Sequence, residues 1–69
     1  MCDFSKRLKQ LRTEHNLTQK ELASATNIGM TTIQSYELNL RIPSITIAAT
    51  LADYFNVSLD YLCGRSDER

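Results

Sequence analysis

The chain is poor in the residues on which several classes of protein depend. It has 69 residues, with one histidine, two cysteines, two glycines, one proline and no tryptophan. The single histidine, His15, has no cysteine or carboxylate cluster around it at metal-ligand spacing. There is no glycine-rich phosphate loop, and no Ser-His-Asp or Cys-His set suited to catalysis stands out. We therefore expect no enzyme, no metal, no cofactor and no small-molecule ligand.

The sequence also lacks the cysteine spacing typical of disulfides or metal sites, and it lacks long apolar runs. Cys2 and Cys63 are far apart and form no C-x-x-C pair, which favours reduced thiols, with Cys63 packed as a small hydrophobe. Residues 1–20 hold too many charges for a signal peptide, and no apolar run approaches the ~20 residues that span a membrane. We expect a soluble, cytoplasmic protein with no membrane partner.

Neither sign of charge dominates. Eight basic and eight acidic residues give a formal net charge of zero, which argues against an indiscriminate binder of polyanions. The charges are nevertheless unevenly placed. Residues 1–42 carry six basic and four acidic residues, whereas residues 43–69 carry two basic and four acidic ones. The first part of the chain can therefore hold a local patch that faces phosphates.

What the sequence does contain is a series of short amphipathic segments. The apolar content of 42% is typical of a globular domain, the length fits one domain, and no stretch alternates as a strand does. We expect an all-α, compact five-helix bundle over residues 1–64, followed by a short charged tail, residues 65–69, that frays. Asp3, Ser44 and Ser58 are expected N-caps, and the stripe predicted to be buried on the fourth helix is Ile45, Ala48, Leu51, Ala52 and Phe55.

The sharpest local pattern begins at Thr18. Thr18 as N-cap and Glu21 at the third helical position form a capping box, and Leu17 and Leu22 are placed as its hydrophobic staple. Asn27 then supplies a turn, because asparagine tolerates a positive φ. A second short helix is expected from about residue 29 to residue 38. Two short helices joined by a turn of three or four residues are the arrangement that lets a protein lay one helix in the major groove of DNA.

The ordered motifs resemble one known family. They are Arg7-Leu8-Lys9, Leu11-Arg12, Leu17-Thr18-Gln19, Glu21-Leu22-Ala23, Ile33, Tyr36-Glu37, Arg41-x-Pro43 and Phe55-x-Val57-Ser58-Leu59-Asp60-Tyr61-Leu62. Over about residues 4–64 the chain resembles the Cro and phage-repressor type of helix-turn-helix domain, the xenobiotic response element family, which implies the lambda-repressor-like fold and double-stranded DNA as partner. The chain departs from the family pattern at Asn27 and Asn39, where glycine is usual, at Gly29, where a capping serine or threonine is usual, and at Met30, where polar residues are common.

One face of the second helix of this pair is the candidate for reading bases. Ile33 and Tyr36 are predicted to point inward, which leaves Met30, Thr31, Gln34 and Ser35 on the outer face. Gln34 can bond bidentately to adenine, while Thr31 and Met30 offer carbon surface to a thymine methyl group. The alternative is an ordinary solvated face, which would more usually carry lysine and glutamate.

Other residues are candidates for the DNA backbone or for structural support. Gln19 begins a helix whose N-terminus suits a phosphate, and the resemblance implies that it lies against the backbone and buttresses the recognition helix. Thr18 could contact phosphate or serve only as a cap. Further candidate phosphate contacts, each with a solvated-surface alternative, are Lys9, Lys20, Asn39 and Arg41. The resemblance also implies a structural ion pair between Arg12 and Glu37.

One such domain covers few base pairs, so two copies are expected on a near-palindrome, with recognition helices roughly 34 Å apart. Apolar residues expected at that dimer interface, or else completing the core, are Leu38, Leu40, Ile42, Ile47 and Tyr61. The resulting hypothesis is a sequence-specific transcriptional regulator, a repressor that occupies an operator. A phage or mobile-element repressor, a restriction–modification controller and an antitoxin all fit. The rival hypothesis is a protein-interaction module with the same fold.

Overall fold

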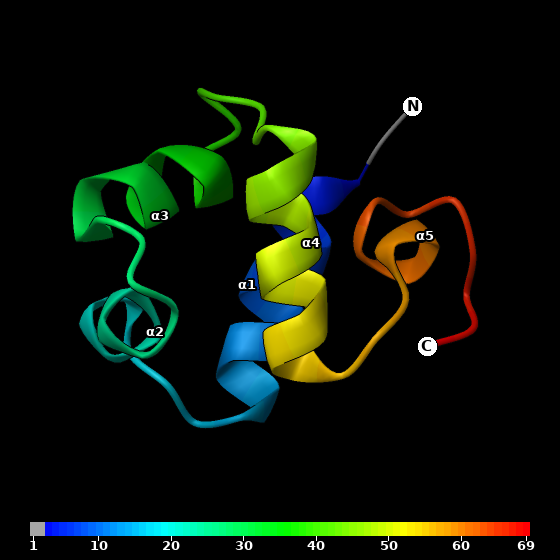
Figure 1. Ribbon diagram of the computed structural model, residues 1–69, viewed down its shortest axis with the longest axis horizontal. Coiled ribbons are helices and arrows are strands. Elements are labelled where there is room, and N and C mark those ends of the chain that lie inside the picture. Colours follow the sequence, from blue (N-terminus) through cyan, green and yellow to red (C-terminus); the bar gives the residue numbers. More distant parts are fainter. Residues whose placement is uncertain (1–2) are drawn as a thin grey trace.

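The computed structural model describes residues 3–69, and within that range it holds five helices and no strand. The helices are α1 (Phe4–Glu14), α2 (Gln19–Thr26), α3 (Met30–Glu37), α4 (Ile45–Phe55) and α5 (Leu59–Leu62). The predicted all-α, five-helix architecture is therefore confirmed. Figure 1 shows α4 crossing in front of α1, with α2 and α3 on one side and α5 and the C-terminal residues on the other. None of these helices is long and apolar enough to cross a membrane.

The core is built from the predicted apolar stripes, with one exception. Leu8, Leu11, Leu22, Ile33, Leu51 and Leu62 are fully buried, and Phe4, Tyr36 and Phe55 pack with them. Ile45 was expected in this core and is instead 75% exposed. It shares a helical face with Ala48, but it lies in the first turn of α4, beyond the edge of the globule. Ile47 packs against the core at this end of the helix instead.

The helix starts follow the predicted caps, except at the first helix. The Thr18 hydroxyl accepts the Glu21 N–H at 3.0 Å and the Glu21 carboxylate accepts the Thr18 N–H at 2.8 Å, which confirms the capping box. Ser44 and Ser58 also cap α4 and α5 through their side chains. Asp3 occupies the N-cap position of α1 without a side-chain capping bond. Its backbone N–H donates instead to the Cys63 carbonyl at 2.9 Å, which joins the start of the chain to the end of α5.

The helix ends depend on asparagine. All four asparagines of the chain, Asn16, Asn27, Asn39 and Asn56, have a positive φ between 56° and 60°. A left-handed residue reverses the chain after a helix, and asparagine is the residue after glycine that adopts it most readily. This confirms the left-handed conformation expected at Asn27 and shows how Asn39 replaces the glycine usual at its position.

The charged tail is held against the body of the protein, contrary to the expectation that it frays. Arg69 donates to the Glu14 carboxylate at 2.7 Å, and Arg7 donates to Asp67 at 2.9 Å. The Ser58 N–H donates to the Arg69 carbonyl at 2.7 Å. In Figure 1 the tail curves around α5 accordingly. The two ion pairs join residues 60 and 55 positions apart, and helical periodicity carries no information at that separation.

The turn after α5 admits only a residue without a side chain. Gly64 has a φ of +78°, and a Cβ built on it would lie 2.8 Å from the Cβ of Asp3 and 2.9 Å from its backbone nitrogen. Both the left-handed backbone and the close approach of Asp3 therefore require glycine here. Cys63, just before it, is half-buried, while Cys2 lies outside the described residues.

Candidate nucleic-acid interface

The helix pair that suggested DNA binding forms as two short helices joined by a tight turn. The left-handed Asn27 ends α2, and the extended backbone of Gly29 leads directly into α3 without a side-chain cap. Figure 1 shows α2 nearly end-on and α3 lengthwise, so the two axes cross steeply. Leu22 and Ala23 of α2 and Ile33 of α3 are buried in the shared core. This packing leaves the opposite face of α3 outside.

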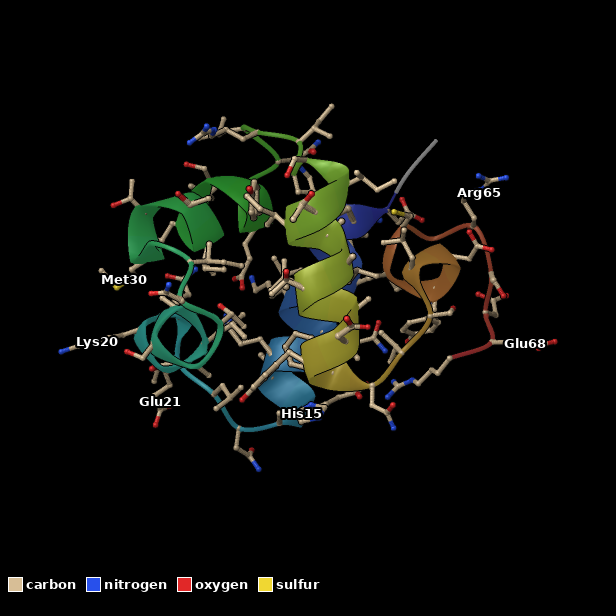
Figure 2. The ribbon with its side chains drawn as sticks, in the orientation of Figure 1. His15, Lys20, Glu21, Met30, Arg65 and Glu68 are labelled. Carbon is tan, nitrogen blue, oxygen red and sulfur yellow. The ribbon has the colours of Figure 1, made fainter. Side chains whose placement is uncertain are left out.

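The face of α3 that was predicted to read bases is accessible. Met30 is 43% exposed and Thr31 is exposed, while Gln34 and Ser35 are partly exposed. The Ser35 hydroxyl donates to the Thr31 carbonyl at 3.0 Å, so its hydrogen is held within the helix. Figure 2 shows Met30 directed away from the body of the protein, toward the same edge as Lys20. All four side chains are thus open to an approaching partner.

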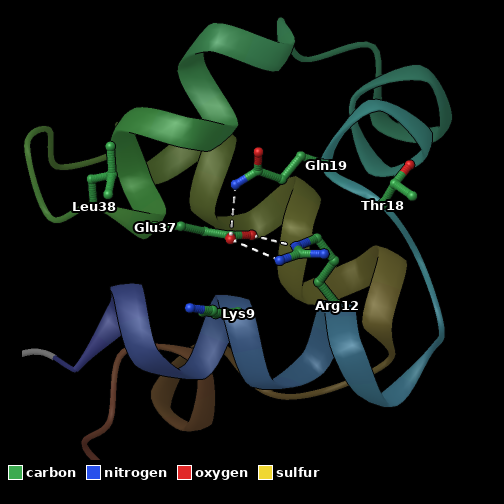
Figure 3. A pocket seen from close by; sticks show the side chains of 6 residues that line it. All are labelled: Lys9, Arg12, Thr18, Gln19, Glu37 and Leu38. Carbon is green, nitrogen blue, oxygen red and sulfur yellow. Dashed lines mark hydrogen bonds and ion pairs between the residues drawn. The ribbon is translucent and has the colours of Figure 1, made fainter.

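Glu37, the last residue of α3, is the centre of a hydrogen-bonded cluster (Figure 3). Its Oε2 accepts from Arg12 Nε at 2.7 Å, and its Oε1 accepts from Arg12 Nη2 at 3.1 Å and from Gln19 Nε2 at 3.1 Å. The Glu37 side chain is only 4% exposed, and that of Arg12 is 14% exposed. Arg12 Nη1 also donates to the Leu17 carbonyl at 2.7 Å. A largely buried bidentate pair that makes a further hydrogen bond to the backbone holds a fixed geometry.

This cluster ties three helices together. Arg12 lies near the end of α1, Gln19 is the first residue of α2, and Glu37 ends α3. Any rotation of α3 against α2 would break hydrogen bonds that are shielded from water, where unpaired polar groups are costly. Sequence reasoning paired Arg12 with Glu37 but missed the bonds from Gln19 to Glu37 and from Arg12 to Leu17. Neither bond follows from residue spacing, because each depends on where the chain turns between α1 and α2.

An open hollow lies beside this cluster. It is lined by Lys9, Arg12, Thr18, Gln19, Glu37 and Leu38 (Figure 3). Three of the predicted phosphate contacts therefore line one hollow: Lys9 from α1, and Thr18 and Gln19 from the N-terminus of α2. The N-terminal N–H groups of a helix favour an anion. Capping uses the Thr18 oxygen as an acceptor and Gln19 commits one amide hydrogen to Glu37, so both residues retain a hydrogen to donate.

The other predicted backbone contacts lie outside this hollow. Lys20 is exposed on α2. Asn39 and Arg41, both exposed, line a second groove between the α3–α4 loop and the start of α1. Lys6 lines that groove as well, although sequence reasoning did not single it out. The one sequence feature that could have indicated a phosphate contact at Lys6 is its position among the other basic residues of α1, which are Arg7, Lys9 and Arg12.

The apolar residues predicted at a dimer interface divide into two sets. Leu38, Leu40 and Ile42 are 68%, 72% and 91% exposed, and Ile45, which follows soon after them in the chain, is exposed as well. We name Leu38, Leu40, Ile42 and Ile45 the loop surface. Ile47 is half-buried against the core. Tyr61 is wrongly assigned to an interface, because it is only 5% exposed and its ring lies under the Arg7 guanidinium, 4.1 Å from the ring centroid.

His15 has a packing role in the structure. Its Nδ1 lies 2.9 Å from the Leu11 carbonyl oxygen, and its ring packs edge-on against Phe55. Within residues 3–69, no three His, Cys, Asp or Glu side chains are grouped to hold a metal ion.

Comparison with known proteins agrees with this geometry. The model of the helix-turn-helix family matches residues 8–62. The HTH-type transcriptional regulator ImmR of Bacillus subtilis is 40% identical over 64 residues, which are 93% of this chain and 50% of ImmR. The cryptic phage CTXphi transcriptional repressor RstR of Vibrio cholerae is 30% identical over 64 residues, covering 93% of this chain and 58% of RstR.

A solved structure gives the same result for the fold. The crystal structure of a transcriptional regulator from Listeria innocua superimposes with a TM-score of 0.87 at 30% identity, over all of this chain and 64% of that one. The chain spans about half the length of the curated relatives described above. Because the family model covers most of its residues, the chain belongs to the helix-turn-helix family, of the Cro and phage-repressor type that its motifs resemble.

Proposed function

We propose that this protein is a sequence-specific binder of double-stranded DNA that regulates transcription, and that it acts as a repressor by occupying an operator. The observation that carries the proposal is the face of α3. Met30 and Thr31 are exposed, Gln34 and Ser35 are partly exposed, and all four are uncharged. The bonds from Glu37 to Arg12 and Gln19 fix the end of α3 against α1 and α2. The named relatives are transcriptional regulators, among them a phage repressor, which supports DNA binding and argues against an enzyme.

In the proposed complex α3 enters the major groove, and Gln34 bonds to a base edge from its outer face. The hollow at the start of α2 receives a backbone phosphate, which Lys9, Thr18 and Gln19 contact. Because Gln19 also donates to Glu37, the same side chain that meets the backbone is braced against α3. Lys20, Asn39 and Arg41 contact phosphates at either side.

Two copies bind together in this proposal. A palindromic operator presents two half-sites roughly one helical turn, 34 Å, apart. In this proposal the two-fold axis passes beside the loop surface, which directly follows α3 in the chain. Contact through Leu40, Ile42 and the half-buried Ile47 would remove exposed apolar area from water.

The test is binding to DNA as a function of salt. Selection from a random pool should yield a palindromic site, and the logarithm of the affinity should fall steeply as the logarithm of the salt concentration rises, through counterion release. The variant Thr31→Ala/Gln34→Ala should lose roughly 1–3 kcal/mol of binding free energy per base contact and keep its fold. Thr50→Ala, at an exposed position on α4, is the matched control. Unchanged binding by the double variant would show that the reading face is wrongly assigned.

A protein partner is the second candidate function, and the loop surface favours it. An apolar surface of this kind can hold another protein as well as a second copy. That function predicts a stable complex without DNA and little dependence on salt. A phage or mobile-element repressor, a restriction–modification controller and an antitoxin remain the settings in which either function fits.

A further inference from the structure

The reading face of α3 carries no charge that a base could meet. The only ionisable side chain with a formal charge among residues 30–37 is Glu37, and Arg12 and Gln19 occupy both of its carboxylate oxygens. Guanine is most often read in the major groove by arginine or lysine, and the exocyclic amine of cytosine by a free carboxylate. Residues 30–37 offer neither group. They therefore lack the side chains that most often select a G·C pair.

The first turn of α3 presents the side-chain carbon atoms of Met30 and Thr31 to an approaching partner. Met30 and Thr31 are the first two residues of the helix and are both exposed. Side chains from the N-terminal turn of a recognition helix lie closest to the base edges. The Ser35 hydroxyl hydrogen is bonded to the Thr31 carbonyl, so Gln34, whose amide offers both donors and an acceptor, and the Thr31 hydroxyl are the polar groups that this face presents beside the carbon atoms of Met30 and Thr31.

We propose, resting on the DNA-binding function above, that Met30 and Thr31 recognise the 5-methyl group of a pyrimidine in the major groove. The methyl group of thymine projects into this groove and takes apolar contacts. A 5-methylcytosine carries a methyl group on the same ring carbon. The two bases present the same apolar feature, so the site accepts 5-methylcytosine where it accepts thymine and disfavours unmethylated cytosine.

The spacing on the helix places a second contact beside the methyl group. Gln34 follows Met30 by four residues, so the two side chains lie on one face, one turn apart. Gln34 can bond bidentately to adenine. The half-site therefore contains a thymine and an adenine at neighbouring pairs. Lys20 and Arg41, exposed outside α3, add affinity through phosphates without selecting a base.

The experiment changes the methyl group alone. A duplex selected from a random pool by the 69-residue chain is remade with deoxyuridine in place of each half-site thymine in turn. At the contacted position the affinity should fall about four-fold, the ratio that corresponds to about 0.8 kcal/mol for one methyl-sized group buried. In a second series, a C·G pair is placed at that position. Methylating its cytosine at C5 should raise the affinity by a similar factor.

Variants assign the effect to the two residues. In Met30→Ala and in Thr31→Ser, which removes only a methyl group, the difference between thymine and deoxyuridine should shrink or vanish. Thr46→Ser is the matched control, because Thr46 is the exposed second residue of α4 as Thr31 is of α3. It should leave the difference intact.

The outcomes separate this inference from the function on which it rests. Salt-dependent binding to a selected site that is indifferent to deoxyuridine at every position, or a site with G·C at all contacted pairs, overturns methyl recognition and leaves DNA binding standing. Failure to select any DNA overturns both. A methyl effect that persists unchanged in both Met30→Ala and Thr31→Ser also overturns the assignment.

Discussion

At the scale of single residues, the Glu37 side chain is the one that connects α3 to both α1 and α2. One nearly buried carboxylate accepts three hydrogen bonds from two other helices. The family motifs implied its pairing with Arg12, because both residues stand at motif positions. The resemblance also implied that Gln19 buttresses the recognition helix, but it did not name Glu37 as the partner of Gln19. That third bond depends on the path of the chain between α1 and α2, which residue spacing does not give.

Replacing Glu37 with leucine should lower the free energy of unfolding by about 3 kcal/mol. The variant leaves the largely buried Arg12 guanidinium without its counter-charge, and breaking such a pair from one side is costly. Urea denaturation measures the loss. The double variant Arg12→Leu/Glu37→Leu should be more stable than Glu37→Leu alone, because no unpaired charge remains. A double variant that is less stable by the sum of both single losses would contradict this reasoning.

At the scale of helices and turns, the sequence predicted more than it did for single contacts. The capping box at Thr18 and the buried stripe from Ala48 to Phe55 follow from local patterns, and both are present. Ile45 fits the same stripe by spacing and lies outside the core. Periodicity predicts which face of a helix is turned toward the core. It does not predict how far along the helix the neighbouring helices extend, and so it could not show that Ile45 is exposed.

Asn56 tests the use of asparagine to end helices. It is the left-handed C-cap of α4, with φ of 56°, and it is exposed. Asn56→Ala should lower the free energy of unfolding by about 1 kcal/mol, because alanine tolerates this conformation poorly. Asn56→Gly should be neutral or slightly stabilising. Urea denaturation of the pair decides, and DNA affinity should be unchanged in both because Asn56 is not on α3. Equal losses in both variants would instead indicate that the asparagine side chain matters for its contacts.

At the scale of the whole molecule, residues from both ends of the described chain meet around α5. Arg7 binds Asp67, Arg69 binds Glu14, and both guanidinium groups lie over the ring of Tyr61. This closure could not be predicted from the sequence, because a charged tail at the end of a domain usually frays. The same contacts explain why Tyr61, which looked available for a partner, is covered within one copy.

Acid should weaken this closure through Glu14. The hydrogen bonds from Arg69 and then Gln10 hold the pKa of Glu14 at about 2, against 4.5 ordinarily. A depressed pKa in the folded state stabilises the fold above pH 4.5, and this contribution is lost as the pH falls from about 4.5 toward 2. Urea denaturation at low salt should therefore show a difference between the protein and Glu14→Gln that is constant above pH 5 and shrinks below pH 4.5. Arg69→Gln should reduce the same pH-dependent portion. A difference that persists unchanged at pH 2.5 would show that the pair does not form in solution.

The loop surface consists of four exposed large apolar side chains, and we expect two copies to meet there. Ile42 is its most exposed member, at 91%. If two copies meet there on the operator, Ile42→Lys buries a charge at the two-fold axis and should weaken binding to the full palindrome at least about tenfold, since one buried isoleucine contributes roughly 2 kcal/mol. Binding to an isolated half-site should not weaken, because the face of α3 is untouched.

Thr50→Lys adds the same charge at an exposed position on α4 and controls for the general attraction of lysine to DNA. Titration of both variants against whole and half operators, with analytical ultracentrifugation of the complexes, distinguishes the possibilities. Equal affinities of Ile42→Lys and Thr50→Lys for the palindrome would mean that the copies meet elsewhere, and the apolar loop surface would then favour a different protein as its partner.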